Sequence, residues 1–170
     1  GSLTLYIEPS RSIYTPNEIF GFAQRRNPKR AFLFVSKVLV RHIPVSPATM
    51  RAASDALAAQ IPSDLPGPIL VIGMAETAIA LGAAVQQAIS RTQHDCVYIC
   101  TTRHPLASPI LVEFREEHSH ATQQVLHYPQ QPEQLALLHQ ARSLVLVDDE
   151  ASTGKTFANL LQALQQAGLD

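Results

Sequence analysis

Two adjacent carboxylates, Asp148 and Asp149, stand where an apolar run at residues 144–147 ends, and small and hydroxyl-bearing residues follow at 151–156. The apolar run predicts a short strand that is buried on both faces. Residues 157–164 then place apolar side chains at helical spacing, which predicts a helix. A strand, a loop and a helix in this order direct backbone N–H groups and the positive end of a helix dipole at one place above the sheet edge. Such a place suits a phosphate group.

The tripeptide Gly154-Lys155-Thr156 also ends the P-loop of nucleoside-triphosphate-binding proteins, so that motif is the first alternative. The P-loop needs a glycine five residues before Gly154, where the chain must turn without a Cβ atom. Asp149 occupies that position here, and the P-loop interpretation therefore fails at its most constrained residue. Two carboxylates at a strand end suit contacts with the hydroxyls of a polyol and with a cation.

Length and composition indicate one domain over residues 3–170, after Gly1 and Ser2, which we interpret as a tag-cleavage scar. The chain is 46% hydrophobic and 16% charged, and its net charge of −1 predicts no general attraction to nucleic acid or to a membrane. No apolar run is long enough to span a bilayer, and no signal peptide is visible. Cys96 and Cys100 are expected to be reduced core thiols of a cytoplasmic protein, because their spacing in an extended segment is too wide for a disulfide.

Alternating strand and helix signals predict an α/β fold with a parallel central sheet flanked by helices. We expect strands at 69–72, 95–101 and 144–147, and helices at 48–60, 78–90 and 132–141; Ser46 is expected to cap the first of these helices, and Gly168 the C-terminus of the last one in the chain. Ligands of such sheets bind at the carboxyl ends of the strands, so the loops after these three strands should meet at one site.

Two segments do not follow the alternation. Residues 102–131 show no clear periodicity and predict a lid, a hairpin or a binding loop. Five of the thirteen Lys and Arg residues gather near a predicted strand at the N-terminal end: Arg25, Arg26, Lys29, Arg30 and Lys37. This basic cluster is either a solvated turn before an edge strand or a binding surface for an acidic or phosphorylated ligand.

The run of apolar strand, Asp-Asp, three residues and Thr-Gly-Lys-Thr resembles the phosphoribosyl-pyrophosphate (PRPP) signature of type I phosphoribosyltransferases. The resemblance extends over residues 27–164. It implies transfer of ribose 5-phosphate from PRPP to a nucleobase-like acceptor with release of pyrophosphate, and it implies Mg²⁺ as the cofactor. The type I fold normally continues into another strand, so either a C-terminal part is missing or residues such as 3–7 complete the sheet.

The resemblance also assigns roles to residues. Asp148 and Asp149 would hold the ribose hydroxyls and position Mg²⁺, and the loop at 73–77, with Ala75 and Glu76, would hold pyrophosphate. The irregular insert at 102–131 would be the flexible catalytic loop, in which Arg103 and His118 are the candidate catalytic residues. Lys37 and Arg30 of the N-terminal segment are further candidate ligands. The cradle for the 5′-phosphate would be formed by Ala151, Ser152, Thr153, Gly154, Lys155 and Thr156.

Three segments point to a subgroup: NPKR at 27–30, FLFVSKVL at 32–39 and FREEHSHAT at 114–122. They resemble the orotate-phosphoribosyltransferase-like proteins of bacterial tellurite-resistance (stress-response) gene clusters. In orotate phosphoribosyltransferases the corresponding basic and aromatic segment holds the base. Members of the subgroup often carry a further C-terminal domain.

Several alternatives stay open at this point. Glu76 is either a ligand or a first-turn helix residue favoured by the helix dipole. His118 and His120 with Glu116 form a weak pattern for structural Zn²⁺, and loop contacts or proton exchange are the other roles for these histidines. The alternative function is a regulatory module that binds PRPP or a nucleotide without turnover. A homodimer is compatible with either function.

Overall fold

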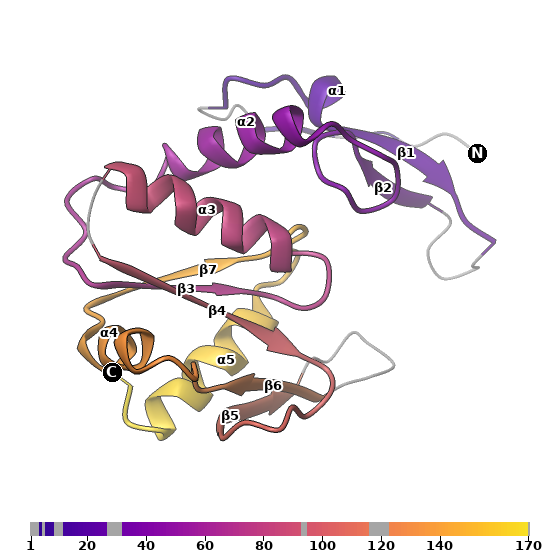
Figure 1. Cartoon of the computed structure of the whole chain (residues 1–170). Helices are drawn as coiled ribbons and strands as arrows, with labels where there is room; N and C mark the ends of the chain where they lie inside the picture. The colour runs from indigo at the N-terminus through magenta and orange to yellow at the C-terminus, as the bar shows by residue number, and fades with distance from the viewer. Residues whose placement is uncertain are drawn as a thin grey trace. The chain divides into compact units, whose positions relative to one another are not determined.

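In the computed structural model of the chain, residues 4, 6–8, 12–26, 32–92, 95–115 and 123–169 are described (Figure 1). The chain separates into two compact units, Gly1–Ala56 and Leu57–Asp170, and each is described by itself. The expectation of one domain over residues 3–170 stays a prediction. None of the helices in the described ranges is long and apolar enough to cross a membrane.

The first unit is built around a two-stranded antiparallel sheet of β1 (Phe20–Gln24) and β2 (Phe32–Ser36), preceded by α1 (Pro16–Ile19). The register places Phe22 opposite Phe34, and alternation puts four phenylalanine rings on one face, where neighbouring rings meet mostly edge to face. The helix α2 (Pro47–Ala58) follows. Its predicted cap is confirmed, because the Thr49 N–H donates to Ser46 Oγ at 3.1 Å.

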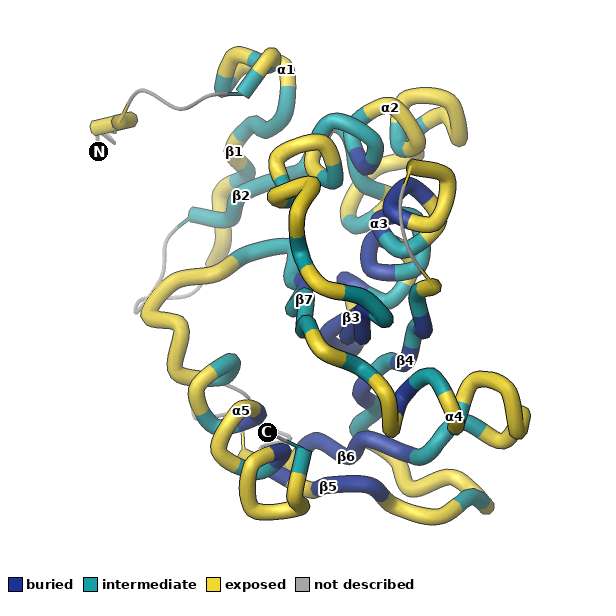
Figure 2. The backbone as a smooth tube through the Cα atoms, turned by 90° about the vertical axis from the view of Figure 1, so that its left-hand side faces the viewer, coloured by how far each residue is buried: buried dark blue, intermediate teal, exposed yellow. Residues whose placement is uncertain are grey.

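The second unit contains a five-stranded mixed sheet in the order β5-β6-β4-β3-β7. Its strands are β3 (Ile69–Gly73), β4 (Cys96–Thr102), β5 (Ile110–Arg115), β6 (Gln123–His127) and β7 (Ser143–Val147). The strands β4, β3 and β7 are parallel, as expected, and β3 is buried along its whole length in the middle of the sheet (Figure 2). The α/β class predicted from the sequence is confirmed.

The segment expected to be irregular contains two of these strands. β5 and β6 pair with each other antiparallel, and β6 pairs antiparallel with the end of β4, so the insert extends the central sheet as a hairpin. The central strands are parallel as expected, and of the three forms predicted for the insert the structure shows the hairpin. Its apolar side chains, which include Leu111, Phe114 and Leu126, are buried in the common core and hold the hairpin to the sheet.

Helices cover both faces of the sheet (Figures 1 and 2). The helix α3 (Ile79–Thr92) packs on one face, against β3, β4 and β7, while α4 (Pro132–Gln140) and α5 (Lys155–Gln166) lie on the other. The observed helices start and end within two residues or so of the predicted ones. Gly168, with φ of +80°, ends α5 in the left-handed conformation, which confirms it as the C-terminal cap.

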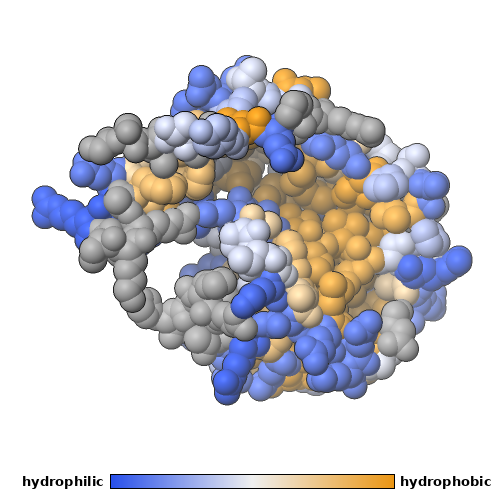
Figure 3. Space-filling model, turned by 180° about the vertical axis from the view of Figure 1, so that it is seen from behind, coloured by the Kyte–Doolittle hydropathy of each residue, from blue (hydrophilic) through white to orange (hydrophobic). Residues whose placement is uncertain are grey.

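The strand β7 differs from the expectation of burial on both faces. Only Val147 is buried, and Leu144, Val145 and Leu146 are half-buried. Within the described residues β7 pairs only with β3 and therefore forms an edge of the sheet. In Figure 3, which shows the molecule from behind, apolar side chains gather over this part of the second unit.

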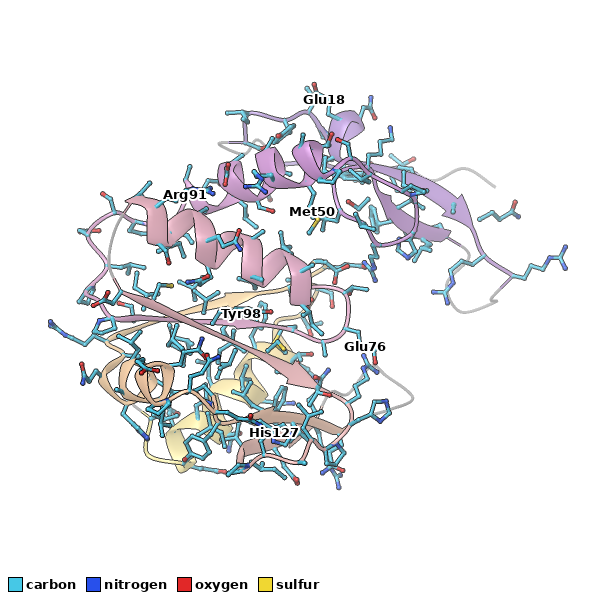
Figure 4. All side chains as sticks on the ribbon, viewed as in Figure 1. Glu18, Met50, Glu76, Arg91, Tyr98 and His127 are labelled. Atoms are coloured by element: carbon cyan, nitrogen blue, oxygen red, sulfur yellow. The ribbon has the colours of Figure 1, made fainter. Side chains whose placement is uncertain are left out.

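A close approach between β3 and α3 fixes the start of the helix against the sheet. A Cβ atom added to Gly82 would lie 2.9 Å from Gly73 Cα and 2.9 Å from Tyr98 Cε2. The Tyr98 hydroxyl donates to the Ile79 carbonyl at 2.6 Å, and burial raises the pKa of Tyr98, so this donor stays protonated (Figure 4). Glycine is needed at position 82 because the two backbones touch, and at position 73 because a Cβ atom would lie 2.6 Å from the Tyr98 hydroxyl.

We expect Gly82→Ala to lower the free energy of unfolding by about 1–3 kcal/mol, the usual cost of overpacking. This loss would outweigh the gain of up to about 1 kcal/mol that alanine brings to a helix interior. Thermal and urea unfolding measure the effect, with the exposed α3 substitution Gln87→Ala as the control. A Gly82→Ala protein as stable as the wild type would contradict this packing.

The two cysteines are free and half-buried, as expected for core thiols. Burial raises the pKa of Cys96 to about 11 from its ordinary value of 9.0, and burial also raises the pKa of Cys100. Because the thiolate is the reactive form, both thiols should be unreactive at pH 8 in the folded protein.

At pH 8 we expect iodoacetamide to modify the native thiols at least about tenfold more slowly than the urea-unfolded thiols. The raised pKa of Cys96 also predicts that its stabilising contribution is present below pH 9 and is lost as the pH rises toward about 11. The difference in melting temperature between pH 8 and pH 10.5 should therefore be smaller in Cys96→Ala than in the wild type. Equal alkylation rates with and without urea would refute this account.

Candidate functional site at the carboxyl ends of the parallel strands

The loops that follow β3, β4 and β7 are joined at the carboxyl ends of these strands. The Met74 N–H donates to the Val147 carbonyl at 2.9 Å, and the Ala75 N–H donates to Thr101 Oγ1 at 2.7 Å. The Thr77 hydroxyl donates to Asp149 Oδ1 at 2.7 Å. The structure therefore brings the three loops together where they were expected to meet.

The two aspartates of the signature are held in different ways. Asp148 Oδ1 accepts the N–H of Asp149 at 2.8 Å, a hydrogen bond within its own turn. Asp149 is contacted by Thr77, 72 residues away in the chain. Both side chains are half-buried at the surface of the sheet edge, rather than enclosed in the core. The pair is thus contacted from two directions; Asp149 Oδ2 is buried, whereas Oδ1 takes part in an exposed hydrogen bond.

The loop after β3 is fixed by fully buried polar side chains. Thr101, at 0% exposure, accepts the Ala75 N–H, and the amide of Gln124, at 1% exposure, lies 3.4 Å from the Ala75 carbonyl. The peptide bond between Ala75 and Glu76 is cis. Glu76 itself is exposed at the tip of the loop, where Figure 4 shows it at the edge of the unit. The neighbouring strands β4 and β6 therefore hold Ala75 and leave Glu76 open to solvent.

The predicted phosphate cradle has the expected local form. Residues 151–155 are exposed and Thr156 is half-buried, and the helix α5 begins at Lys155. Gly154 precedes it with φ of +73°, a conformation that other residues adopt only with strain, and no atom lies within 4 Å of where its Cβ would be. A turn through glycine into the N-terminus of a twelve-residue helix leaves backbone N–H groups available to an anion.

The loop after β4 is attached to the insert hairpin by His127. The Leu106 N–H donates to His127 Nε2 at 3.1 Å, so Nδ1 carries the proton and donates to the Ser108 carbonyl at 2.9 Å. His127 is 7% exposed (Figure 4). Arg103 lies at the start of this loop and is half-buried. The loop that carries the candidate cation Arg103 therefore has one fixed attachment to β6.

Three predicted site residues belong to the first unit or lie outside the described residues. Lys37 belongs to the first unit, where its ammonium donates to the Asn17 carbonyl at 2.7 Å. Arg30 and His118 lie outside the described residues, as do Glu116 and His120 of the weak Zn²⁺ pattern. Their roles stay predictions.

The donor set at the sheet edge fits Mg²⁺ and does not form a closed metal cage. Asp148 and Asp149 supply carboxylate oxygens, the kind of ligand that Mg²⁺ prefers. Over the described ranges, no group of three or more His, Cys, Asp or Glu side chains is arranged to hold a metal ion. Two carboxylates suit a cation that keeps water ligands and completes its shell with substrate phosphates.

Thr77, Thr101 and Gln124 were not among the predicted site residues. Thr101 ends a strand with strictly alternating burial, so its inward direction could have been inferred from the pattern. Gln124 and Thr77 carry no local signal, because their partners lie 49 and 72 residues away.

We expect Thr101→Val to release the loop after β3, because a buried N–H without an acceptor costs about 1–3 kcal/mol. Amide hydrogen exchange at Ala75 should become faster in Thr101→Val and stay slow in Thr101→Ser, which keeps the hydroxyl. Unchanged protection of Ala75 in the valine variant would show that Thr101 does not hold this loop.

Comparison with known proteins gives both a family and related folds. The chain matches the family model described as phosphoribosyl transferase over residues 19–169. No curated protein matches it.

Solved structures with a similar fold include three adenine phosphoribosyltransferases. That of Leishmania tarentolae has a TM-score of 0.58 at 15% identity, over 89% of this chain and 66% of that one. That of Trypanosoma brucei, solved with AMP, pyrophosphate and ribose-5-phosphate, has a TM-score of 0.58 at 14% identity, over 92% and 64%. That of Rhodothermus marinus has a TM-score of 0.54 at 15% identity, over 89% and 77%.

The chain thus spans just under two thirds of the length of the first two structures, and the likeness to all three is one of fold. The match to the family model covers both the strands that form the sheet edge and the Asp-Asp loop. On this evidence the chain belongs to the phosphoribosyl transferase family.

Proposed function

We propose that this protein transfers ribose 5-phosphate from PRPP to a nitrogen of a nucleobase-like acceptor and releases pyrophosphate, with Mg²⁺ as cofactor. The observation that carries the proposal is the pair Asp148 and Asp149 at the end of β7, followed directly by the turn into α5 and joined to the loop after β3. One edge of the sheet thereby offers places for a sugar, a phosphate and a second anion.

Each part of PRPP has a matching group at this edge. The 5′-phosphate suits the turn at residues 151–156, where the helix dipole and unpaired N–H groups favour an anion. The ribose hydroxyls suit the carboxylates of Asp148 and Asp149, which accept hydrogen bonds. The pyrophosphate suits the loop after β3, with Ala75 and Glu76, together with Arg103 from the loop after β4.

The charges of these loops explain why a cation is proposed. Glu76, Asp148, Asp149 and Glu150 are acidic, whereas Arg103 and Lys155 are basic. A polyanion would be repelled by four carboxylates beside two cations unless a metal ion joined them. When bound, Mg²⁺ supplies the positive charge that stabilises the leaving pyrophosphate. Asp148 and Asp149 would hold it, with substrate oxygens and water completing the shell.

The reaction needs no covalent protein nucleophile. The bond between C1 of the ribose and the pyrophosphate oxygen breaks, and its electron pair leaves with pyrophosphate. A nitrogen lone pair of the acceptor forms the new bond to C1, and the acceptor loses its proton. Positive charge develops on the ribose ring, so the neighbouring carboxylates would favour the transition state. The Trypanosoma brucei structure holds this same combination of nucleotide, pyrophosphate and sugar phosphate on a similar fold.

The finer expectations belong to the same proposal. The sequence resemblance implies an orotate-like acceptor site with Arg30, Lys37 and the rest of the basic cluster. It also implies proton transfer by His118. The remaining expectations are membership of a tellurite-resistance gene cluster, a cytoplasmic location and a homodimer. The acceptor assay below addresses the first of these expectations, the acceptor site.

The test measures the release of pyrophosphate from PRPP in the presence of Mg²⁺ and a panel of purine and pyrimidine bases, which includes orotate and adenine. We expect release with at least one base. In Asp148→Asn and Asp149→Asn, kcat/KM should fall by about 100-fold or more, the scale on which one preorganised electrostatic group acts. Asp64→Asn, in an exposed turn before β3, is the matched control and should keep the wild-type rate.

Two other outcomes would decide against transfer. Calorimetric binding of PRPP without release of pyrophosphate for any base would favour the regulatory module. A protein that neither binds PRPP nor releases pyrophosphate would refute both functions.

A further inference from the structure

We propose that Thr77 is a positioning residue, whose hydroxyl sets the orientation of the Asp149 carboxylate for binding the sugar. This inference rests on the proposed function, because it assigns Asp149 to the ribose. Its basis is the hydrogen bond from Thr77 Oγ1 to Asp149 Oδ1, which at 2.7 Å has the length of a charge-assisted bond. The bond joins the proposed pyrophosphate loop directly to the proposed ribose-binding pair.

Thr77 can act as a fixed donor because the loop on which it stands is held at both ends. Before it, Met74 is bonded to Val147 and Ala75 to Thr101, which is fully buried. After it, the Ala78 N–H donates to the Met74 carbonyl at 3.1 Å, and α3 begins at Ile79. A side chain between two such attachments has little freedom to move away from its partner.

The Asp149 carboxylate is contacted from another loop. Asp148 Oδ1 is bonded to the backbone within the same turn, whereas Asp149 lies in a bend between β7 and α5 and receives its hydroxyl donor from another loop. A carboxylate that contacts two adjacent ribose hydroxyls must be held to within about 0.5 Å of its productive position. Because Asp149 Oδ2 is buried and the bond from Thr77 to Oδ1 is exposed, Oδ1 is the oxygen that a sugar can reach, and the Thr77 hydroxyl fixes its position.

The competing account is that this exposed bond only contributes to stability, as a loop-to-loop contact. The two accounts differ in what they predict for ligand binding. A stabilising contact would lower the melting temperature of a variant and leave its affinity unchanged. A positioning contact changes affinity and turnover even where the variant is fully folded, and it is restored by any side chain that returns the hydroxyl.

The experiment compares Thr77→Val, which removes the hydroxyl at similar size, with Thr77→Ser, which keeps it. The control is Thr92→Val, at the C-terminal end of α3, where the hydroxyl lies 3.5 Å from the Ala88 carbonyl and 3.2 Å from the Ile89 carbonyl of its own helix. Ribose 5-phosphate with Mg²⁺ is titrated into each protein by calorimetry at a temperature where all are folded. Pyrophosphate release is measured in parallel.

We expect Thr77→Val to weaken the affinity for ribose 5-phosphate about tenfold or more, the effect of losing one hydrogen bond to a charged group. Its kcat/KM should fall at least as much, with a drop in kcat as well as a rise in KM. Thr77→Ser and Thr92→Val should stay within about twofold of the wild type. A crystal structure of Thr77→Val should show the Asp149 carboxylate rotated.

The outcomes separate this inference from the proposed function. Wild-type affinity in Thr77→Val, or failure of Thr77→Ser to restore it, overturns the positioning role while transfer stands. Absence of pyrophosphate release with every base overturns transfer, but the sugar-phosphate affinities still decide for or against Thr77. A wild-type protein that does not bind ribose 5-phosphate at all overturns both.

Discussion

The pairing of β3 with β7 is the constraint on which the site depends. The register sets Ile69 opposite Ser143 and Gly73 opposite Val147, so the two parallel strands end at the same level. The ladder continues for one more bond, from Met74 to Val147. Because the strands end level, the loops that follow start side by side, and side chains from them can meet. A different register would move one loop along the strand by about 3.3 Å per residue and separate them.

Close contacts behind this edge make the arrangement rigid. The glycines at 73 and 82 let α3 approach β3 to the distance of touching backbones, and Tyr98 ties the first turn of α3 to β4. On the other face, the Asn159 amide on α5 donates to the Arg115 carbonyl at the end of β5. The helix that follows the Asp-Asp loop is thus joined to the insert hairpin. Loops on such a scaffold can be preorganised for a ligand at little further cost in conformational entropy.

Buried polar groups behind the site serve its geometry more than its chemistry. Thr101 and Gln124 lie in the core, where an unsatisfied polar group would be costly. Thr101 accepts the Ala75 N–H, and the Gln124 amide lies near the Ala75 carbonyl. The groups in front, the exposed Glu76 and the half-buried Asp148 and Asp149, are acidic. These carboxylates would repel a polyanionic substrate unless a cation lay between them and the substrate. This is the physical reason for including Mg²⁺ in the proposed function.

The sequence by itself determined the local parts of this protein. The strand at 144–147, the Asp-Asp pair and the hydroxyl-rich turn into a helix lie within a few residues of one another, so spacing alone predicted them together with the α/β class. Only the tertiary structure decided that the insert joins the sheet as a hairpin, that β7 is a half-buried edge within the described residues, and that Thr77 contacts Asp149. These features depend on strand register and on contacts between residues far apart in the chain, and no short-range pattern of residue types encodes such contacts.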